Sequence, residues 1–105
     1  AIWNRLQGMT SQQVHGIVTD LRANKQLSLA MAASLGERGS NAFLESSFAL
    51  WSGHPLHHVR DVFTMQNPPQ FVQLMKEAGV PKEMAPRFLK LVKTEYASKR
   101  ESVAA

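Results

Sequence analysis

Three histidines stand close together in this sequence, at His54, His57 and His58, and they form its densest group of side chains that could do chemistry. His54 and His58 are four residues apart, so on a helix their rings could converge on one metal ion. The pattern is incomplete, because no glutamate lies between the two histidines and Asp61 is the only nearby carboxylate on a plausible face. Pro55 also places His54 at or before the start of a helix. The favoured interpretation is that these histidines are partly exposed or lie at the N-terminus of a helix. A metal site at His54 and His58 and a pH-sensitive contact are the alternatives. No cofactor is expected.

The other polar side chains do not form a catalytic set in the sequence. The eight acidic residues are scattered singly, so no pair of carboxylates stands out for acid–base chemistry. Glu45 is placed to form an ordinary ion pair between helices, with either Arg60 or Arg38. Ser46, Ser47 and Ser52 lie near His54 in the sequence and make only a nominal pair of nucleophile and base, because the Gly-x-Ser-x-Gly setting of a nucleophile elbow is missing. The sequence therefore predicts no catalytic residue.

The net charge of +4 comes from the last third of the chain, because residues 76–100 carry the basic excess and the remainder is nearly neutral. Such an excess can bind acidic protein surfaces or phosphate backbones. A lysine-rich last helix is also a common solvated surface that complements the helix dipole. The basic candidates for contact with a partner are Lys76, Arg87, Lys90 and Lys93.

Helices must position all of these side chains, since apolar residues recur at helical spacing and no stretch alternates like a strand. The first such stripe consists of Val14, Ile17, Val18 and Leu21. Helix starts are predicted at Thr10 or Ser11, Ser28, Ser40, Pro55, Asn67 and Pro86. Gly53 and Gly79 stand where left-handed C-terminal caps belong. We expect an all-α fold of five to six short helices stacked as antiparallel hairpins, either a short solenoid or an irregular bundle.

A Gly-x-Pro junction occurs twice, at Gly53 and at Gly79, and suggests a weak internal repeat. Aligning the two junctions pairs Phe48 with Leu74, Ala49 with Met75, Val62 with Phe88 and Phe63 with Leu89. Two stacked helical hairpins would need apolar residues at all of these positions, so the repeat predicts that they meet at a shared interface.

Three segments of the chain, 21–35, 41–60 and 74–81, carry a resemblance to a known family. They comprise an Ala-Leu helix, a Phe-bearing helix that ends in Gly-x-Pro-Leu-x-x-Val-Arg, and a further helix that ends in Ala-Gly-x-Pro. The stretch from Leu21 to Lys93 resembles a bacterial helical-repeat family of unknown function, whose proteins look like short HEAT-type solenoids. The resemblance implies stacked helices and assigns no chemistry, because a fold alone does not define a function.

Length and composition limit the remaining possibilities. A chain of 105 residues with 44% hydrophobic residues fits one domain, which we expect to have its core within residues 10–97 and a frayed tail at 98–105. The chain contains no cysteine, so disulfides and thiolate chemistry are excluded and a cytoplasmic location is favoured. No apolar run is long enough to span a membrane, and Ala1–Gly8 lacks the pattern of a secretory leader, so no membrane partner is expected.

These observations predict a noncatalytic module that binds another protein, or regulates one, or associates with a second copy of itself. Its expected contacts are the basic residues named above and Trp3, which belongs to an apolar N-terminal segment that could dock onto a partner. Nucleic-acid binding through phosphate contacts is the second hypothesis. A small enzyme that uses His54, His57 and His58 is the third.

Overall fold

The computed structural model describes residue 6 and residues 8–96 of the 105-residue chain. Six helices account for most of this part, which contains no strand, so the predicted all-α class is confirmed. They are α2 (Ser11–Ala23), α3 (Leu29–Glu37), α4 (Asn41–Ser52), α5 (Leu56–Met65), α6 (Pro68–Glu77) and α7 (Ala85–Glu95). Trp3 and the expected tail at 98–105 lie outside the described residues.

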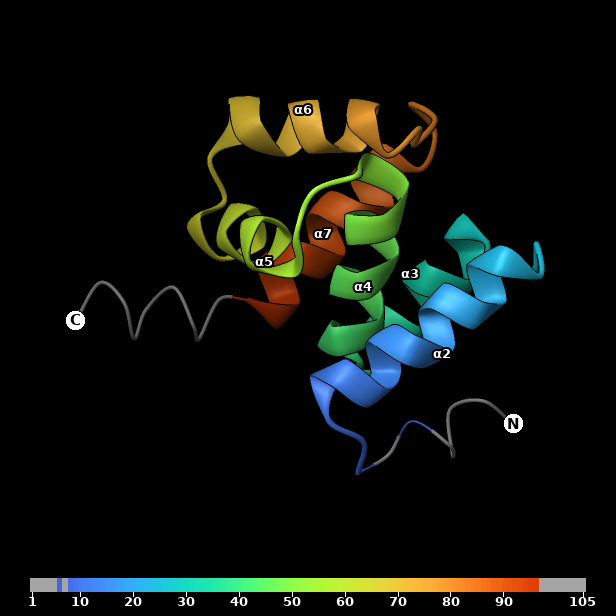
Figure 1. Ribbon diagram of the computed structural model, residues 1–105. Coiled ribbons are helices and arrows are strands. Elements are labelled where there is room, and N and C mark those ends of the chain that lie inside the picture. The colour runs from blue at the N-terminus through green and yellow to red at the C-terminus, as the bar shows by residue number, and fades with distance from the viewer. Residues whose placement is uncertain (1–5, 7, 97–105) are drawn as a thin grey trace.

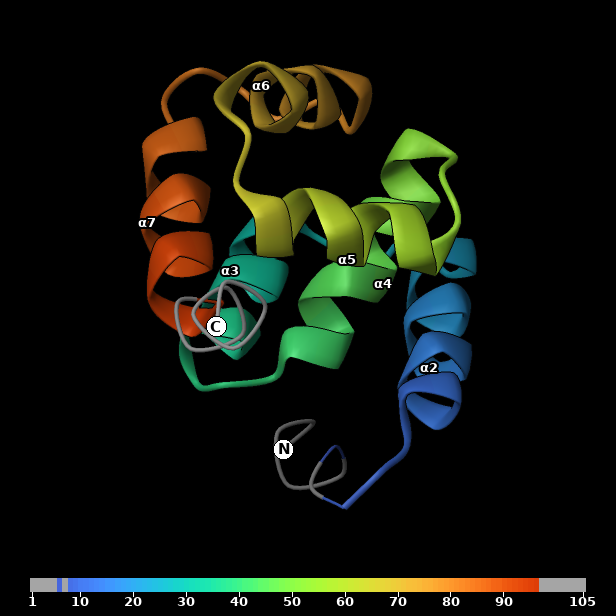
Figure 2. The same cartoon turned by 90° about the vertical axis from the view of Figure 1, so that its left-hand side faces the viewer.

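Helix α4 runs through the centre of the molecule and contacts α2, α3, α5 and α6 (Figures 1 and 2). Its sequence explains this position, because apolar and small residues surround the helix and a helix that is apolar on all sides is normally buried. Phe43, Leu44 and Phe48 are completely buried. Even its polar residues Ser46 and Ser47 are inaccessible to solvent.

Aromatic rings join α4 to the helices on either side of it. The ring of Phe48 meets Phe63 of α5 and Phe88 of α7 edge to face, with centroids 5.5 and 5.0 Å apart. Such pairs stabilise a protein by about 0.5–1.5 kcal/mol beyond the area they bury. The three rings belong to the larger of two apolar clusters, while Val14, Val18 and Phe43 belong to a second cluster between α2, α3 and α4.

Most of the helix ends follow from the predicted capping residues. The Thr10 side chain accepts a hydrogen bond from the Gln13 backbone N–H, and the Gln13 side chain bonds back to Thr10, which is a complete capping box. The side chains of Ser28 and Asn67 cap α3 and α6 by accepting a hydrogen bond from the backbone N–H three residues on, without the reciprocal bond of a capping box. The prediction that Pro55 lies in the first turn of its helix was wrong by one position. Pro55 has extended backbone with ψ 157° and forms the N-cap, so α5 begins at the next residue.

Helices α3 and α7 pack closely, although they are far apart in the sequence. The approach depends on Gly36, because a Cβ atom there would lie 2.8 Å from Cδ2 of Leu91. Beside this contact, Glu37 and Arg87 form an ion pair. A solenoid restricts contacts to neighbouring repeats, so the described helices form the irregular bundle, the second of the two predicted arrangements.

The internal repeat predicted eight apolar positions at an interface, and seven of them are buried. Val62, Phe63 and Phe88 are buried as the alignment requires. Leu89 is 38% exposed. It faces outward because Phe88, Leu91 and Val92 already form the buried side of α7.

Candidate functional site

The histidine cluster forms a contact between the start of α5 and the end of α6. Nε2 of His54 lies 3.0 Å from Oε1 of Glu77, and the ring of His58 packs on His54 with the centroids 4.3 Å apart. The two rings therefore lie together, although His54 precedes the N-cap of α5, as predicted, and is not on the helix. His57 and His58 are exposed, in agreement with the favoured interpretation. Within the described part of the chain, no three His, Asp or Glu side chains are grouped so that they could hold a metal ion.

His15 joins this region, which the sequence did not indicate. It comes from α2 and lines the same open depression of about 540 Å³ as His54. Its Nδ1 lies 3.1 Å from Oγ of Ser46. Ser46 is only 1% exposed, so its hydroxyl is not accessible to a substrate, and the contact holds α2 against α4.

The nominal pair of Ser52 and His54 does not have the geometry of a nucleophile and a base. The Ser52 hydroxyl donates to the carbonyl of Phe48 over 2.6 Å and accepts a hydrogen bond from the backbone N–H of His54, not from its ring. Both bonds belong to the end of α4, where they satisfy backbone groups. Their role is structural.

Glu45 is a buried carboxylate that holds three helical segments together. Its Oε1 accepts from Nε of Arg60 at 3.2 Å, as one of the two predicted ion pairs requires. Its Oε2 accepts from the hydroxyl of Tyr96 at 2.6 Å. Burial and the neighbouring Glu45 charge raise the pKa of the Tyr96 phenol far above its ordinary value. Both oxygens are therefore engaged in packing interactions of the fold.

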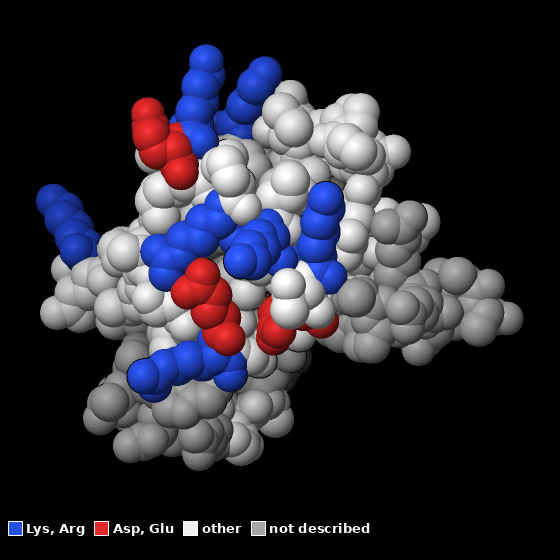
Figure 3. Space-filling model, turned by 180° about the vertical axis from the view of Figure 1, so that it is seen from behind, with Lys and Arg blue, Asp and Glu red and all other residues white. Residues whose placement is uncertain are grey.

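The basic residues predicted to contact a partner separate into two groups. Arg87 donates two hydrogen bonds to Glu37, at 2.8 and 2.9 Å, and this pairing lowers the pKa of the Glu37 carboxyl and raises the pKa of the Arg87 guanidinium. Glu37 and Arg87 line a depression between α3 and α7, and Lys90 lines it with them. Figure 3 shows acidic side chains among the lysines and arginines of this face. The surface there is mixed in charge.

Lys76 lies elsewhere, at the edge of an apolar groove between α6 and α7 that the sequence analysis missed. The groove encloses about 380 Å³. Its apolar lining includes Phe71, Val72, Met75, Val80, Pro86 and Leu89. Val72 is 51% exposed and Leu89 is 38% exposed, so the groove presents apolar surface from both helices to solvent. Lys82 lies at the edge together with Lys76.

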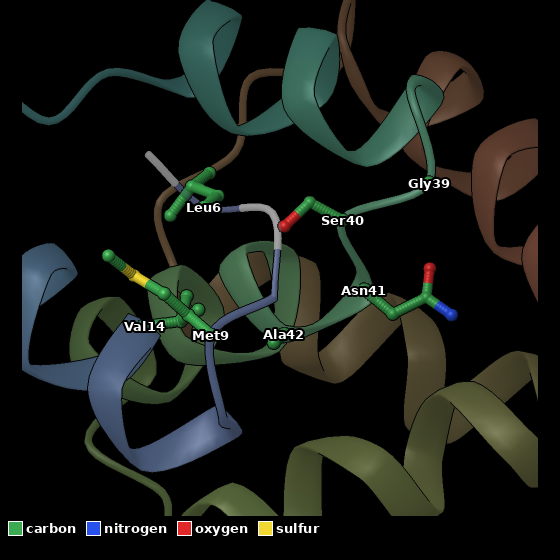
Figure 4. A pocket seen from close by; sticks show the side chains of 7 residues that line it. All are labelled: Leu6, Met9, Val14, Gly39, Ser40, Asn41 and Ala42. Carbon is green, nitrogen blue, oxygen red and sulfur yellow. The ribbon is translucent and has the colours of Figure 1, made fainter. Parts of the chain in front are cut away.

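A fourth hollow, of about 320 Å³, lies beside the start of α4. Figure 4 shows Leu6, Met9 and Val14 on one side of it, whereas the side chain of Asn41 points away from them. Oδ1 of Asn41 is buried and has no hydrogen-bond partner in the described structure. Because that oxygen is directed away from the hollow, it does not equip the hollow to bind a ligand.

Comparisons with known proteins indicate no function, so the function must be inferred from the groove. No family model matches the chain, and neither a curated protein nor a solved structure is significantly similar to it. None of the helices in the described ranges is long and apolar enough to cross a membrane.

Proposed function

We propose that this chain is a noncatalytic module that binds another protein through the groove between α6 and α7. The observation that carries the proposal is the exposure of Val72 and Leu89 beside a concave apolar surface. Exposed apolar surface of this kind marks interaction sites in proteins. A regulatory role through such binding, the predicted cytoplasmic location and the likeness to helical-repeat proteins remain parts of this proposal.

The distribution of charge supports a protein ligand over a nucleic acid. The lining of the groove is apolar apart from the two lysines at its edge. The basic side of α7 includes Arg87, which Glu37 already neutralises in part. A nucleic acid would need a continuous positive surface that follows a phosphate backbone.

A comparison of two exposed apolar positions tests the proposal. Val72→Asp places a charge in the groove, whereas Met65→Asp places the same charge on an equally exposed apolar residue at the end of α5. In affinity capture from the native source followed by mass spectrometry, we expect a protein that the native chain and Met65→Asp retain and that Val72→Asp loses. Identical sets of captured proteins for all three chains would contradict the proposal.

Nucleic-acid binding is the second candidate, because Lys76, Lys82 and Lys93 form no ion pair with any described residue. Fluorescence anisotropy with duplex DNA and RNA at low salt tests it. Binding should weaken steeply as salt rises, with a slope set by the number of phosphates contacted. No association at low salt would eliminate this candidate.

A further inference from the structure

The groove is lined by apolar side chains of α6 and of the first turns of α7. Val72 and Met75 lie on one side of it and Pro86 and Leu89 on the other, so apolar side chains line both walls. Amphipathic helices commonly dock in such grooves by inserting apolar residues spaced i, i+3, i+4 and i+7. The hollow between α6 and α7 suits projecting side chains of a partner better than the flat surface of a lipid bilayer.

The charged residues that line the groove are all basic. Lys76 and Lys82 line it, and no described acidic residue does. Lys93 follows Leu89 by four residues on α7, so it extends the basic edge along the same helix face. Glu77, next to Lys76, is held by His54. Glu83 follows Lys82 in the chain but does not line the groove.

A second copy of this chain does not offer a helix of matching charge. Among the described helices, α2, α5 and α6 each carry one acidic and one basic residue and α7 is net basic, so only α3 and α4 are net acidic, each through a single glutamate. Glu37 of α3 is paired with Arg87, and Glu45 of α4 is buried against Arg60 and Tyr96. The matching charge must therefore come from a different protein.

From this shape and charge we infer that the groove binds an acidic amphipathic helix of another protein, with its apolar stripe between α6 and α7 and its carboxylates beside Lys76, Lys82 and Lys93. The inference rests on the proposed function and adds to it the chemistry of the partner. Complementary charge at the edge of an interface sets the specificity and the rate of association more than the affinity.

A peptide selection on the full chain tests the charge of the partner. The library fixes leucines at i, i+3, i+4 and i+7 and offers glutamate, lysine, glutamine or alanine at the flanking positions. The native chain should enrich glutamate at those positions. The Lys76→Glu/Lys82→Glu chain should enrich lysine instead. Arg22→Glu/Lys25→Glu changes the net charge equally on α2 and the loop after it, and should select the same peptides as the native chain.

The selected acidic peptide then measures the effect directly. Its affinity for Lys76→Glu/Lys82→Glu should be about fivefold or more below its affinity for the native chain, the scale that two exposed ion pairs support. Val72→Asp and, separately, Leu89→Gln should also weaken binding, while circular dichroism shows that each variant keeps its helices. Two exposed positions are used so that a folding defect in one does not decide the result.

The outcomes separate this inference from the proposed function. Peptides that bind in the groove without preferring glutamate would overturn the acidic partner and leave the docking groove intact. Recovery of no peptide, or of peptides that bind Val72→Asp and Leu89→Gln as well as the native chain, would overturn both. Binding of the groove to phosphatidylglycerol vesicles, without selection of acidic peptides, would assign the site to lipid and would also overturn the inference.

Discussion

The hydroxyl of Tyr96 donates a hydrogen bond to Oε2 of Glu45 across 2.6 Å, and it thereby attaches the end of α7 to the central helix. Tyr96 is completely buried and Glu45 is 3% exposed. A buried charge without hydrogen-bond partners destabilises the folded state. The Glu45 carboxylate must therefore keep its hydrogen bonds in the folded protein. The contact therefore helps to hold the end of α7 against α4.

Removal of the hydroxyl should destabilise the protein. We expect Tyr96→Phe to lower the free energy of unfolding by about 1–3 kcal/mol, since Glu45 loses a buried donor. Thr19→Val is the matched control, because it removes a hydroxyl whose hydrogen bond to the backbone of His15 is exposed, and it should change stability much less. Urea unfolding at neutral pH measures both variants. Equal stability of Tyr96→Phe and the native chain would show that the contact has no net effect.

Alkaline pH should destabilise the native chain through the same residue. Burial and the Glu45 charge raise the pKa of Tyr96, so the folded state keeps its proton above pH about 10, where an ordinary tyrosine ionises. The unfolded state then binds fewer protons than the folded state, and stability falls as pH rises, by at most about 1.4 kcal/mol per pH unit.

This alkaline effect can be isolated because the chain has one tyrosine. Above pH about 10, the stability advantage of the native chain over Tyr96→Phe should shrink, and phenolate absorbance should appear only as the protein unfolds. Phenolate absorbance from the fully folded protein near pH 10 would contradict the raised pKa.

Two glycines in helices should respond differently to substitution by alanine. Gly16 lies in α2 with open space around the position of a Cβ, so Gly16→Ala should stabilise the protein by about 0.5–1 kcal/mol. In Gly36→Ala the new methyl group meets Leu91, which must shift, so the same gain should not appear. Unfolding in urea compares the two. An equal gain at both positions would mean that α3 and α7 are not in close contact.

The ion pair between Glu37 and Arg87 should respond to acid and to salt. Because Arg87 lowers the pKa of Glu37, the stabilisation is present above the ordinary glutamate value of about 4.3 and is lost as pH falls through the lowered value. Carboxyl-carbon NMR should show the Glu37 titration moving up in Arg87→Leu. Both side chains are more than a third exposed, so high salt should weaken the pair. An unchanged titration in the variant would contradict the pairing.

Local signals in the sequence were sufficient for the helices and for several contacts within the fold. Caps such as Thr10 and Asn67 act through neighbouring backbone groups, so their positions predict helix starts directly. The ion pair of Glu45 was predicted with two candidate arginines, and the structure identifies Arg60 as a partner. The position of Pro55 predicted that His54 lies at or before the start of a helix, but not its bond to Glu77, which comes from another helix.

Features that depend on how distant helices meet were not predictable. The contact of Gly36 with Leu91 depends on the packing angle of α3 against α7, which apolar periodicity within one helix does not encode. The groove escaped prediction for the same reason. Val72 lies beside the buried stripe of α6, and Leu89 was assigned to the core by a repeat that its helix does not follow.

Amide chemical-shift mapping of the isotopically labelled chain, titrated with the acidic peptide from the selection, tests the central claim most directly. The account predicts that the largest shifts occur at Val72, Lys76 and Leu89, on the two walls of the groove. It predicts small shifts around His15 and Leu50, which line the depression between α2 and the start of α5. Largest shifts at that depression, or at the face of Arg87 and Glu37, would contradict the groove as the docking site.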